Sequence, residues 1–179
     1  MPDEAFEHLV RTYHAPLYRF ALSMARNVAD ANDLTQQTFF VWATKGHTLR
    51  DAAKVKTWLF TTLYREFLRT RRQQQRTASF EDLPDGEQEP TEAESNVVNR
   101  LDAPLIMAAL QEIPPLHREP LTLFYLENLS YLEIAGILDV PVGTVMSRLS
   151  RAKIQLRGVL ARKASEPKII EFPKQGTGP

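Results

Sequence analysis

Five arginines lie close together between residues 65 and 76, and such a cluster is chemically suited to binding phosphate. At a rise of ~1.5 Å per helical residue the cluster spans about 18 Å, which is comparable with several phosphate spacings along a strand. A guanidinium binds phosphate bidentately and stacks on unpaired bases, so we predict a single-strand-binding surface, with a merely solvated basic face as the alternative. The arginines are Arg65, Arg69, Arg71, Arg72 and Arg76, and Glu66 is the only acid among them.

A second group of polar side chains follows a predicted turn at residues 139–141. Ser130 can cap a helix that ends at this turn, and Glu133 completes a capping box, while Pro141 suits the first position of the next helix. The next helix carries hydroxyls and arginines beside an apolar stripe, which indicates a DNA-reading helix-turn-helix; a helical hairpin with a solvated face is the alternative. Its candidate DNA-facing residues are Thr144, Met146, Ser147, Arg148, Ser150 and Arg151.

A long helix from about residue 54 to residue 76 must position the arginine cluster. Its predicted buried stripe is Val55, Trp58, Leu59, Leu63 and Phe67. The aromatic residues Trp58, Phe60 and Tyr64 add possible surfaces on which bases could stack. Before it, a helical stripe runs from Phe6 to Met24 and is interrupted by Pro16, which predicts two helices or one kinked helix.

Residues 30–42 form another predicted helix, with Asp30 or Asn32 able to cap its start. The pattern points Leu34, Thr38, Val41 and Trp42 one way. Polar residues and Phe39 fall on or near another face. An exposed Phe39 among them would mark a partner surface. Core packing of Phe39 is the open alternative. The polar residues on that face are Asp33, Gln36 and Gln37.

Length and composition predict an all-α protein of two small helical domains. The chain has 179 residues, of which 43% are hydrophobic, enough for one or two small cores. It contains no run of some eighteen apolar residues and no signal-peptide pattern, so we expect a cytoplasmic protein without membrane insertion. With zero cysteines and four scattered histidines, we expect no disulfide, no metal site and no cofactor.

The net charge of zero hides three blocks of different charge. Residues 1–76 carry a net charge of +5, residues 77–103 carry −7 and residues 104–179 carry +2. The acidic middle block has few large apolar residues, which predicts a flexible linker. We therefore expect helical domains at 1–76 and 104–163, and a disordered tail at 164–179.

Together these segments resemble a sigma factor of the extracytoplasmic-function type. The resemblance covers almost everything from Phe6 to Leu160, and the order and spacing of several segments carry it, since no single short motif does. In the amino-terminal half the matching segments are Asp30 to Trp42 (DANDLTQQTFFVW) and the Trp58-Leu59-Phe60 start of the long helix. In the carboxy-terminal half they are Leu110 to Pro114 (LQEIP), Tyr125 to Ala135 (YLENLSYLEIA) and Pro141 to Arg148 (PVGTVMSR).

The resemblance implies a non-enzymatic initiation factor that directs core RNA polymerase to promoters and opens the DNA. Implied partners are the clamp helices of the largest polymerase subunit, the flap of the second subunit, promoter DNA and an anti-sigma factor. The residues implied to dock on the clamp are Asp30, Asp33, Gln36, Gln37 and Phe39. Those implied to bind the melted strand are Leu49, Arg50, Lys54, Trp58, Thr61, Tyr64, Arg65, Arg69 and Arg72. The helix beginning at Pro141 would read the distal promoter element.

Departures from the family pattern fall on positions that would contact DNA. Leu49 stands where Phe is common, Thr61 where Arg is frequent, and Met146 replaces a usual basic residue. A lost phosphate contact lowers the salt dependence of DNA binding, so the second domain alone is expected to bind duplex weakly. Two alternatives therefore stay open: a duplex-binding regulator that acts without polymerase, and an adaptor whose DNA contacts have decayed.

Overall fold

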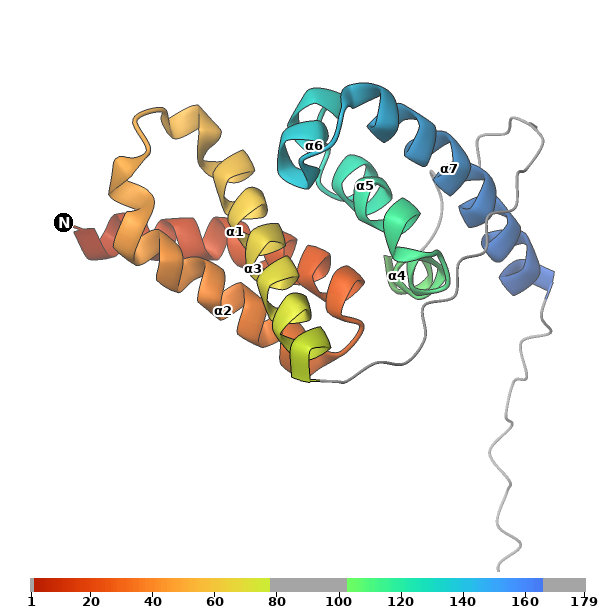
Figure 1. Cartoon of the computed structure of the whole chain (residues 1–179), viewed down its shortest axis with the longest axis horizontal. Coiled ribbons are helices and arrows are strands. Elements are labelled where there is room, and N and C mark those ends of the chain that lie inside the picture. Colours follow the sequence, from red (N-terminus) through yellow and green to blue (C-terminus); the bar gives the residue numbers. More distant parts are fainter. Residues whose placement is uncertain (1, 78–102, 166–179) are drawn as a thin grey trace, which may run out of the picture.

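Every regular element in the described part of the chain is helical (Figure 1). The computed structural model describes residues 2–77 and 103–165. Most of the predicted linker at 77–103 and of the predicted tail at 164–179 lies outside these ranges. The all-α class and the division into two helical domains are confirmed.

The first domain packs three long helices against one another. These are α1 (Pro2–Ala25), α2 (Val28–Lys45) and α3 (Val55–Thr77). Two short 3₁₀ turns, Gly46–Thr48 and Ala52–Lys54, connect α2 to α3. The apolar stripes of α1 and α3 meet in the core, where the Phe20 and Phe60 rings lie 5.7 Å apart. The predicted stripe of the long helix thus faces the interior at Leu59 and Leu63.

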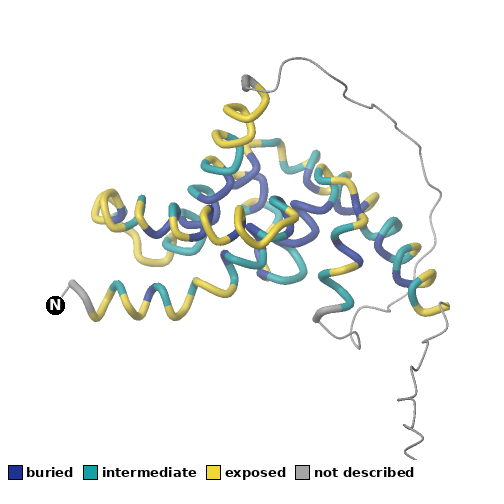
Figure 2. The backbone as a smooth tube through the Cα atoms, turned by 90° about the horizontal axis from the view of Figure 1, so that it is seen from below, coloured by how far each residue is buried: buried dark blue, intermediate teal, exposed yellow. Residues whose placement is uncertain are grey.

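In this domain one local prediction is decided between its alternatives and another needs correction. Pro16 does not divide the segment into two helices, since α1 runs through it as a single helix from Pro2 to Ala25. Figure 2 shows that the early turns of α1 are mostly exposed and that its later turns enter the buried centre. The cap of α2 is Asn27 rather than Asp30 or Asn32, because its side-chain oxygen accepts a hydrogen bond from the Asp30 backbone N–H at 2.8 Å.

The second domain consists of four helices and contains the predicted helix-turn-helix. The helices are α4 (Ala103–Gln111), α5 (Pro115–Tyr125), α6 (Tyr131–Leu138) and α7 (Val142–Ser165). The Ser130–Glu133 capping box is present, and Asp139 turns the chain with a left-handed φ of 55°. Pro141 precedes the recognition helix instead of opening it, since α7 begins at Val142 and the Pro141 carbonyl accepts from the Thr144 N–H.

The two domains pack directly on each other, with α3 against α6 and α1 against α4 and α5 (Figure 1). At this interface Glu127 is only 3% exposed and forms a 3.0 Å ion pair with Arg19 of α1. Lys56 of α3 donates to the Glu127 backbone carbonyl. The helix-turn-helix domain therefore covers part of the long helix that carries the arginine cluster.

Candidate nucleic-acid interface

The loop before α3 and the first turns of α3 enclose a pocket of about 530 Å³. Five of the predicted strand-binding residues line it together, although they were predicted from separate parts of the sequence. They are Leu49, Lys54, Trp58, Thr61 and Arg65. Apolar, hydroxyl and cationic side chains thus meet in one hollow, a combination that suits an unstacked base and its phosphate. Glu133 of α6 also lines this pocket, so the second domain forms part of its wall.

A pair of packed tryptophans forms part of the wall of this pocket and the layer behind it. The rings of Trp42 and Trp58 meet edge to face at a centroid distance of 5.0 Å. Gly46 lies beneath the Trp42 ring, where a Cβ atom would come within 2.5 Å of Trp42 Cδ2. The close packing leaves Trp58 half-buried, with part of its surface facing the pocket. Trp58 is therefore both a core residue and a pocket residue.

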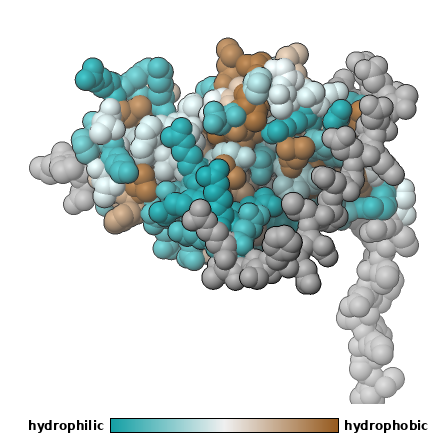
Figure 3. Space-filling model, viewed as in Figure 1, coloured by the Kyte–Doolittle hydropathy of each residue, from teal (hydrophilic) through white to brown (hydrophobic). Residues whose placement is uncertain are grey.

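The basic end of α3 is exposed as predicted. Arg65, Arg69 and Arg72 are all exposed, and they line a groove of about 500 Å³ between α3 and α6. Figure 3 shows hydrophilic side chains over α3 next to hydrophobic ones toward α6. Arg69 also forms a 2.6 Å ion pair with Glu66, so one of the three cations is partly neutralised. Arg50, in the loop, is exposed as well.

Two of the predicted stacking surfaces are buried in this structure. Phe60 is 0% exposed in the core, so the prediction that a base could stack on it is wrong. Tyr64 is 9% exposed, and its hydroxyl donates to Glu119 Oε2 of α5 at 3.2 Å. Burial, with the neighbouring Glu119 carboxylate, raises the pKa of Tyr64 to about 12. Tyr64 therefore contacts the second domain instead of solvent.

The recognition helix presents a mixed polar and apolar face. Met146, Ser147, Ser150 and Arg151 are exposed, while Thr144 and Arg148 are half-buried. The predicted apolar stripe faces the domain core through Val145, Leu149, Ala152 and Leu156. Met146 is 53% exposed, which makes it available for contact with a thymine methyl group.

The carboxylate of Glu119 sits where three arginines and Tyr64 converge between the domains. Burial raises the pKa of Glu119. The hydrogen bond from Tyr64 opposes that rise, and so do the positive charges of Arg118, Arg148 and Arg71. Arg148 of the recognition helix thus has an electrostatic partner inside the protein. Arg148 is half-buried beside this carboxylate.

The residues predicted to dock on the clamp differ in exposure: the polar ones reach the surface, while Phe39 follows the core-packing alternative. Asp30, Asp33 and Gln36 are exposed and Gln37 is half-buried. Phe39 is only 7% exposed, however, and its ring packs against Phe6 and His14.

The exposed aromatic residue on this helix is Phe40, at 63%. Phe40 was not among the predicted docking residues. The hydropathy pattern does not show it, because α2 buries two threonines, Thr35 and Thr38, whose hydroxyls donate to backbone carbonyls four residues earlier. A prediction that counted Thr35 as part of the buried stripe would have placed Phe39 on the inner face of the helix and Phe40 on the outer face.

Two family models match the chain, one on each helical domain. Sigma-70 region 2 matches residues 9–77 and sigma-70 region 4 matches residues 104–156. The ECF RNA polymerase sigma factor SigE of Mycolicibacterium smegmatis is 33% identical over 168 residues, which are 90% of this chain. The chain belongs to the extracytoplasmic-function group of the sigma-70 family. It spans 64% of the length of the SigE relative.

Other sigma factors resemble this one over both domains. SigM of Bacillus subtilis is 28% identical over 160 residues, covering 89% of this chain and 98% of the relative. The sigma factor RpoE of Bartonella quintana, solved with the anti-sigma factor NepR, matches with a TM-score of 0.70 at 26% identity, over 88% of this chain and 98% of that one. CnrH, solved with the cytosolic domain of CnrY, shares the fold with a TM-score of 0.62 at 21% identity, over 92% and 91% of the two chains.

The described ranges of this sigma factor hold no group of three or more His, Asp or Glu side chains that could bind a metal ion. Within the same ranges, no helix is long and apolar enough to cross a bilayer.

Proposed function

We propose that this sigma factor binds core RNA polymerase and directs it to a specific set of promoters, where it helps to open the DNA. The family consists of transcription initiation factors that are not themselves enzymes, so the chemistry belongs to the polymerase. Promoter DNA and polymerase are the expected partners, the clamp helices meeting α2 and the flap meeting the second domain. Because these partners are cytoplasmic, we expect the protein to act in the cytoplasm.

The observation that carries this proposal is the pocket between the loop and α3. A regulator that only reads duplex DNA needs a helix-turn-helix. It has no need for a pocket large enough to admit a base, lined by Leu49, Lys54, Trp58 and Thr61. Flipping a base costs a few kcal/mol of stacking, which contacts in such a pocket can return. The exposed arginines along α3 supply the neighbouring phosphate contacts.

The packed arrangement of the domains implies that they separate before the strand is bound. Tyr64 can meet a base only after Glu119 releases its hydroxyl, and Glu133 must leave the pocket wall. We infer that polymerase binding holds the domains apart. An anti-sigma factor, as in the RpoE–NepR complex, is the expected partner that would oppose this change.

Transcription in vitro with core polymerase and fragmented DNA of the source genome tests the proposal. We expect discrete start sites that require the protein. Three variants should weaken them: Arg151→Ala on the recognition helix, the double variant Arg69→Ala/Arg72→Ala on α3, and Phe40→Ala on the clamp-facing side of α2. Each altered side chain is exposed, so the unfolding temperature should stay close to that of the wild type.

The variants separate this function from its alternatives. Tight duplex binding without polymerase, and no new transcripts, would identify a duplex-binding regulator. Polymerase binding that Phe40→Ala weakens, without transcripts or DNA binding, would identify an adaptor. An initiation factor requires that Arg151→Ala and the α3 double variant lose transcripts while they still bind core polymerase.

A further inference from the structure

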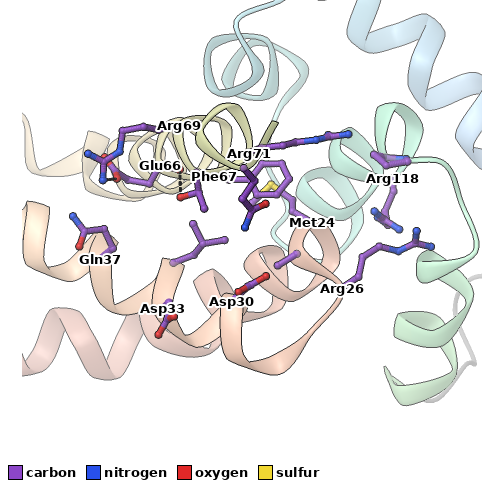
Figure 4. A pocket seen from close by; sticks show the side chains of 15 residues that line it. Met24, Arg26, Asp30, Asp33, Gln37, Glu66, Phe67, Arg69, Arg71 and Arg118 are labelled. Carbon is purple, nitrogen blue, oxygen red and sulfur yellow. Dashed lines mark hydrogen bonds and ion pairs between the residues drawn. The ribbon is translucent and has the colours of Figure 1, made fainter. Parts of the chain in front are cut away.

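A cavity of about 520 Å³ lies between the two domains, away from the strand-binding pocket. The end of α1, the first turns of α2, the basic half of α3 and the start of α5 form its walls (Figure 4). Four arginines line it: two come from α3, one from the α1–α2 junction and one from α5. They are Arg69, Arg71, Arg26 and Arg118.

Arg118 is the unusual residue of this cavity, because it is 0% exposed and incompletely hydrogen bonded. Its Nη1 donates to the Gln111 backbone carbonyl at 3.3 Å, while Nε and Nη2 have no hydrogen-bond partner. Nε and Nη2 form one edge of the guanidinium, the edge that binds a carboxylate or phosphate bidentately. Burying two donors without hydrogen-bond partners costs free energy, so an acceptor bound at this edge would stabilise the protein.

Arg26 brings a second positive charge to the same place. Its Nη2 donates to the same Gln111 carbonyl, and Figure 4 shows its guanidinium beside that of Arg118. Arg26 also adopts a left-handed φ of 65°, a conformation that favours glycine, so its side chain stands there at a conformational cost. Burial and the nearby Arg26 lower the pKa of Arg118 to about 10.

Near this end of the cavity, the buried Glu119 carboxylate interacts electrostatically with Arg118 and Arg71. Among the described residues, Arg26, Arg71 and Arg118 form no ion pair within 4.0 Å. Of the acids that line the cavity, Glu66 is engaged by Arg69 and Asp30 by Asn27. Asp30 and Asp33 lie along the α2 wall, which Figure 4 shows on a different side from Arg118. Three arginines, Arg26, Arg71 and Arg118, thus face one buried carboxylate, which leaves this end of the cavity with a net positive charge.

We propose that this arginine end of the cavity binds one oxyanion, a phosphate or a carboxylate, which bridges the two domains through Arg118 and Arg26. The anion fills the free Nε–Nη2 edge of Arg118 and removes the repulsion between the two guanidiniums. Because Arg26 belongs to the first domain and Arg118 to the second, the complete site exists only while the domains are packed together. By linkage, the anion then favours the packed arrangement. This inference does not rest on the proposed function.

A titration of the full chain with inorganic phosphate tests the site, with sodium chloride at matched ionic strength as the reference. The chain has no cysteine, so His47→Cys and Gly158→Cys, both at exposed positions, allow a pair of dyes to report domain separation. We expect phosphate to raise the unfolding temperature saturably and to increase energy transfer between the dyes. Neither effect should follow chloride.

Two variants at the site and one matched control make the test specific. Arg26→Asn removes the charge and tolerates the left-handed backbone, and Arg118→Lys keeps the charge but lacks the bidentate edge. Each should weaken phosphate binding by roughly tenfold or more. Arg11→Asn, a surface substitution on α1 with the same charge loss, should leave the affinity unchanged. Equal affinity in all four proteins would overturn the proposal.

A further variant identifies the source of the anion. It replaces with amides the eight acids between the two domains in the sequence, namely Glu81, Asp82, Asp85, Glu87, Glu89, Glu92, Glu94 and Asp102. If the chain's own carboxylates occupy the site, phosphate will bind this variant more tightly than the wild type. If free phosphate is the ligand, the two affinities will agree. No saturable binding to either protein would overturn the proposal.

Discussion

At the scale of single residues, the tryptophan pair shows how packing shapes the strand-binding pocket. Trp58 lines the pocket on one side and contacts the Trp42 ring on the other. Gly46 leaves room for that ring, so a residue without a side chain determines where the indole of Trp58 sits. The pocket therefore depends on a contact outside it.

Gly46→Ala should destabilise the first domain by about 1–3 kcal/mol, because its Cβ would overlap the Trp42 ring. The extent of promoter opening, measured with a fluorescent base in the melted element, should decrease as well. Gly158→Ala is the control, since a Cβ there meets nothing within 4 Å and alanine favours helix. Equal stability of the two variants in urea would contradict this account of the pair.

Glu119 predicts a pH dependence that one substitution can isolate. Burial raises its pKa above the unfolded value of 4.5, so the folded protein holds this proton more tightly. The resulting stability is complete below pH 4.5 and is lost as the pH rises through the raised pKa. The wild type should therefore lose stability relative to Glu119→Gln as the pH rises above 4.5. Urea unfolding of both proteins measures this difference, and a difference independent of pH would refute it.

At the scale of the helix, α7 combines a well-packed inner stripe with an outer face that is poor in charge near its start. Met146 occupies an exposed position there, and Arg148 is drawn toward Glu119. Of the two predicted DNA-facing arginines of this helix, Arg148 and Arg151, only Arg151 is exposed in the packed arrangement. Duplex affinity from this helix should therefore be low and weakly dependent on salt.

Met146→Lys should add one phosphate contact to the duplex complex. The slope of log affinity against log salt should then steepen by about 0.9, with tighter binding at low salt. Met146→Gln, which adds no charge, should leave the slope unchanged. Fluorescence anisotropy with a duplex at several salt concentrations measures both, and equal slopes for all three proteins would place Met146 outside the DNA interface.

At the scale of the whole molecule, the interface between the domains joins charged groups from distant parts of the sequence. Arg19 donates from Nε and Nη2 to the two carboxylate oxygens of Glu127, at 3.2 and 3.3 Å. Glu127 is buried, so its charge depends on this partner from the other domain. Opening the interface exposes both groups to water.

Arg19→Gln should shift the molecule toward separated domains, since it leaves the Glu127 carboxylate buried without its ion pair, at a cost of roughly 1–3 kcal/mol. Energy transfer between dyes at positions 47 and 158 should decrease. The double variant Arg19→Gln/Glu127→Gln removes the buried charge and should recover part of the transfer. If Arg19→Gln behaves like the surface variant Arg11→Gln, the ion pair does not hold the domains together.

The sequence by itself determined the helical class, the helix-turn-helix and the segments that gather around the pocket. These features follow from near-neighbour interactions: the Ser130–Glu133 capping box, the break at Asp139 and the 3.6-residue period of α3. Family resemblance supplied the roles of the segments, because their order along the chain is visible without a structure.

Only the tertiary structure decided which side of each helix is available. Tyr64 is covered by Glu119, 55 residues away, and Phe39 is buried against Phe6 and His14 of α1. Arg118 and Arg26 likewise share the Gln111 carbonyl only when the second domain packs beside the end of α1. Burial at these positions depends on neighbours that are distant in the chain, and periodicity along a single helix carries no information about them.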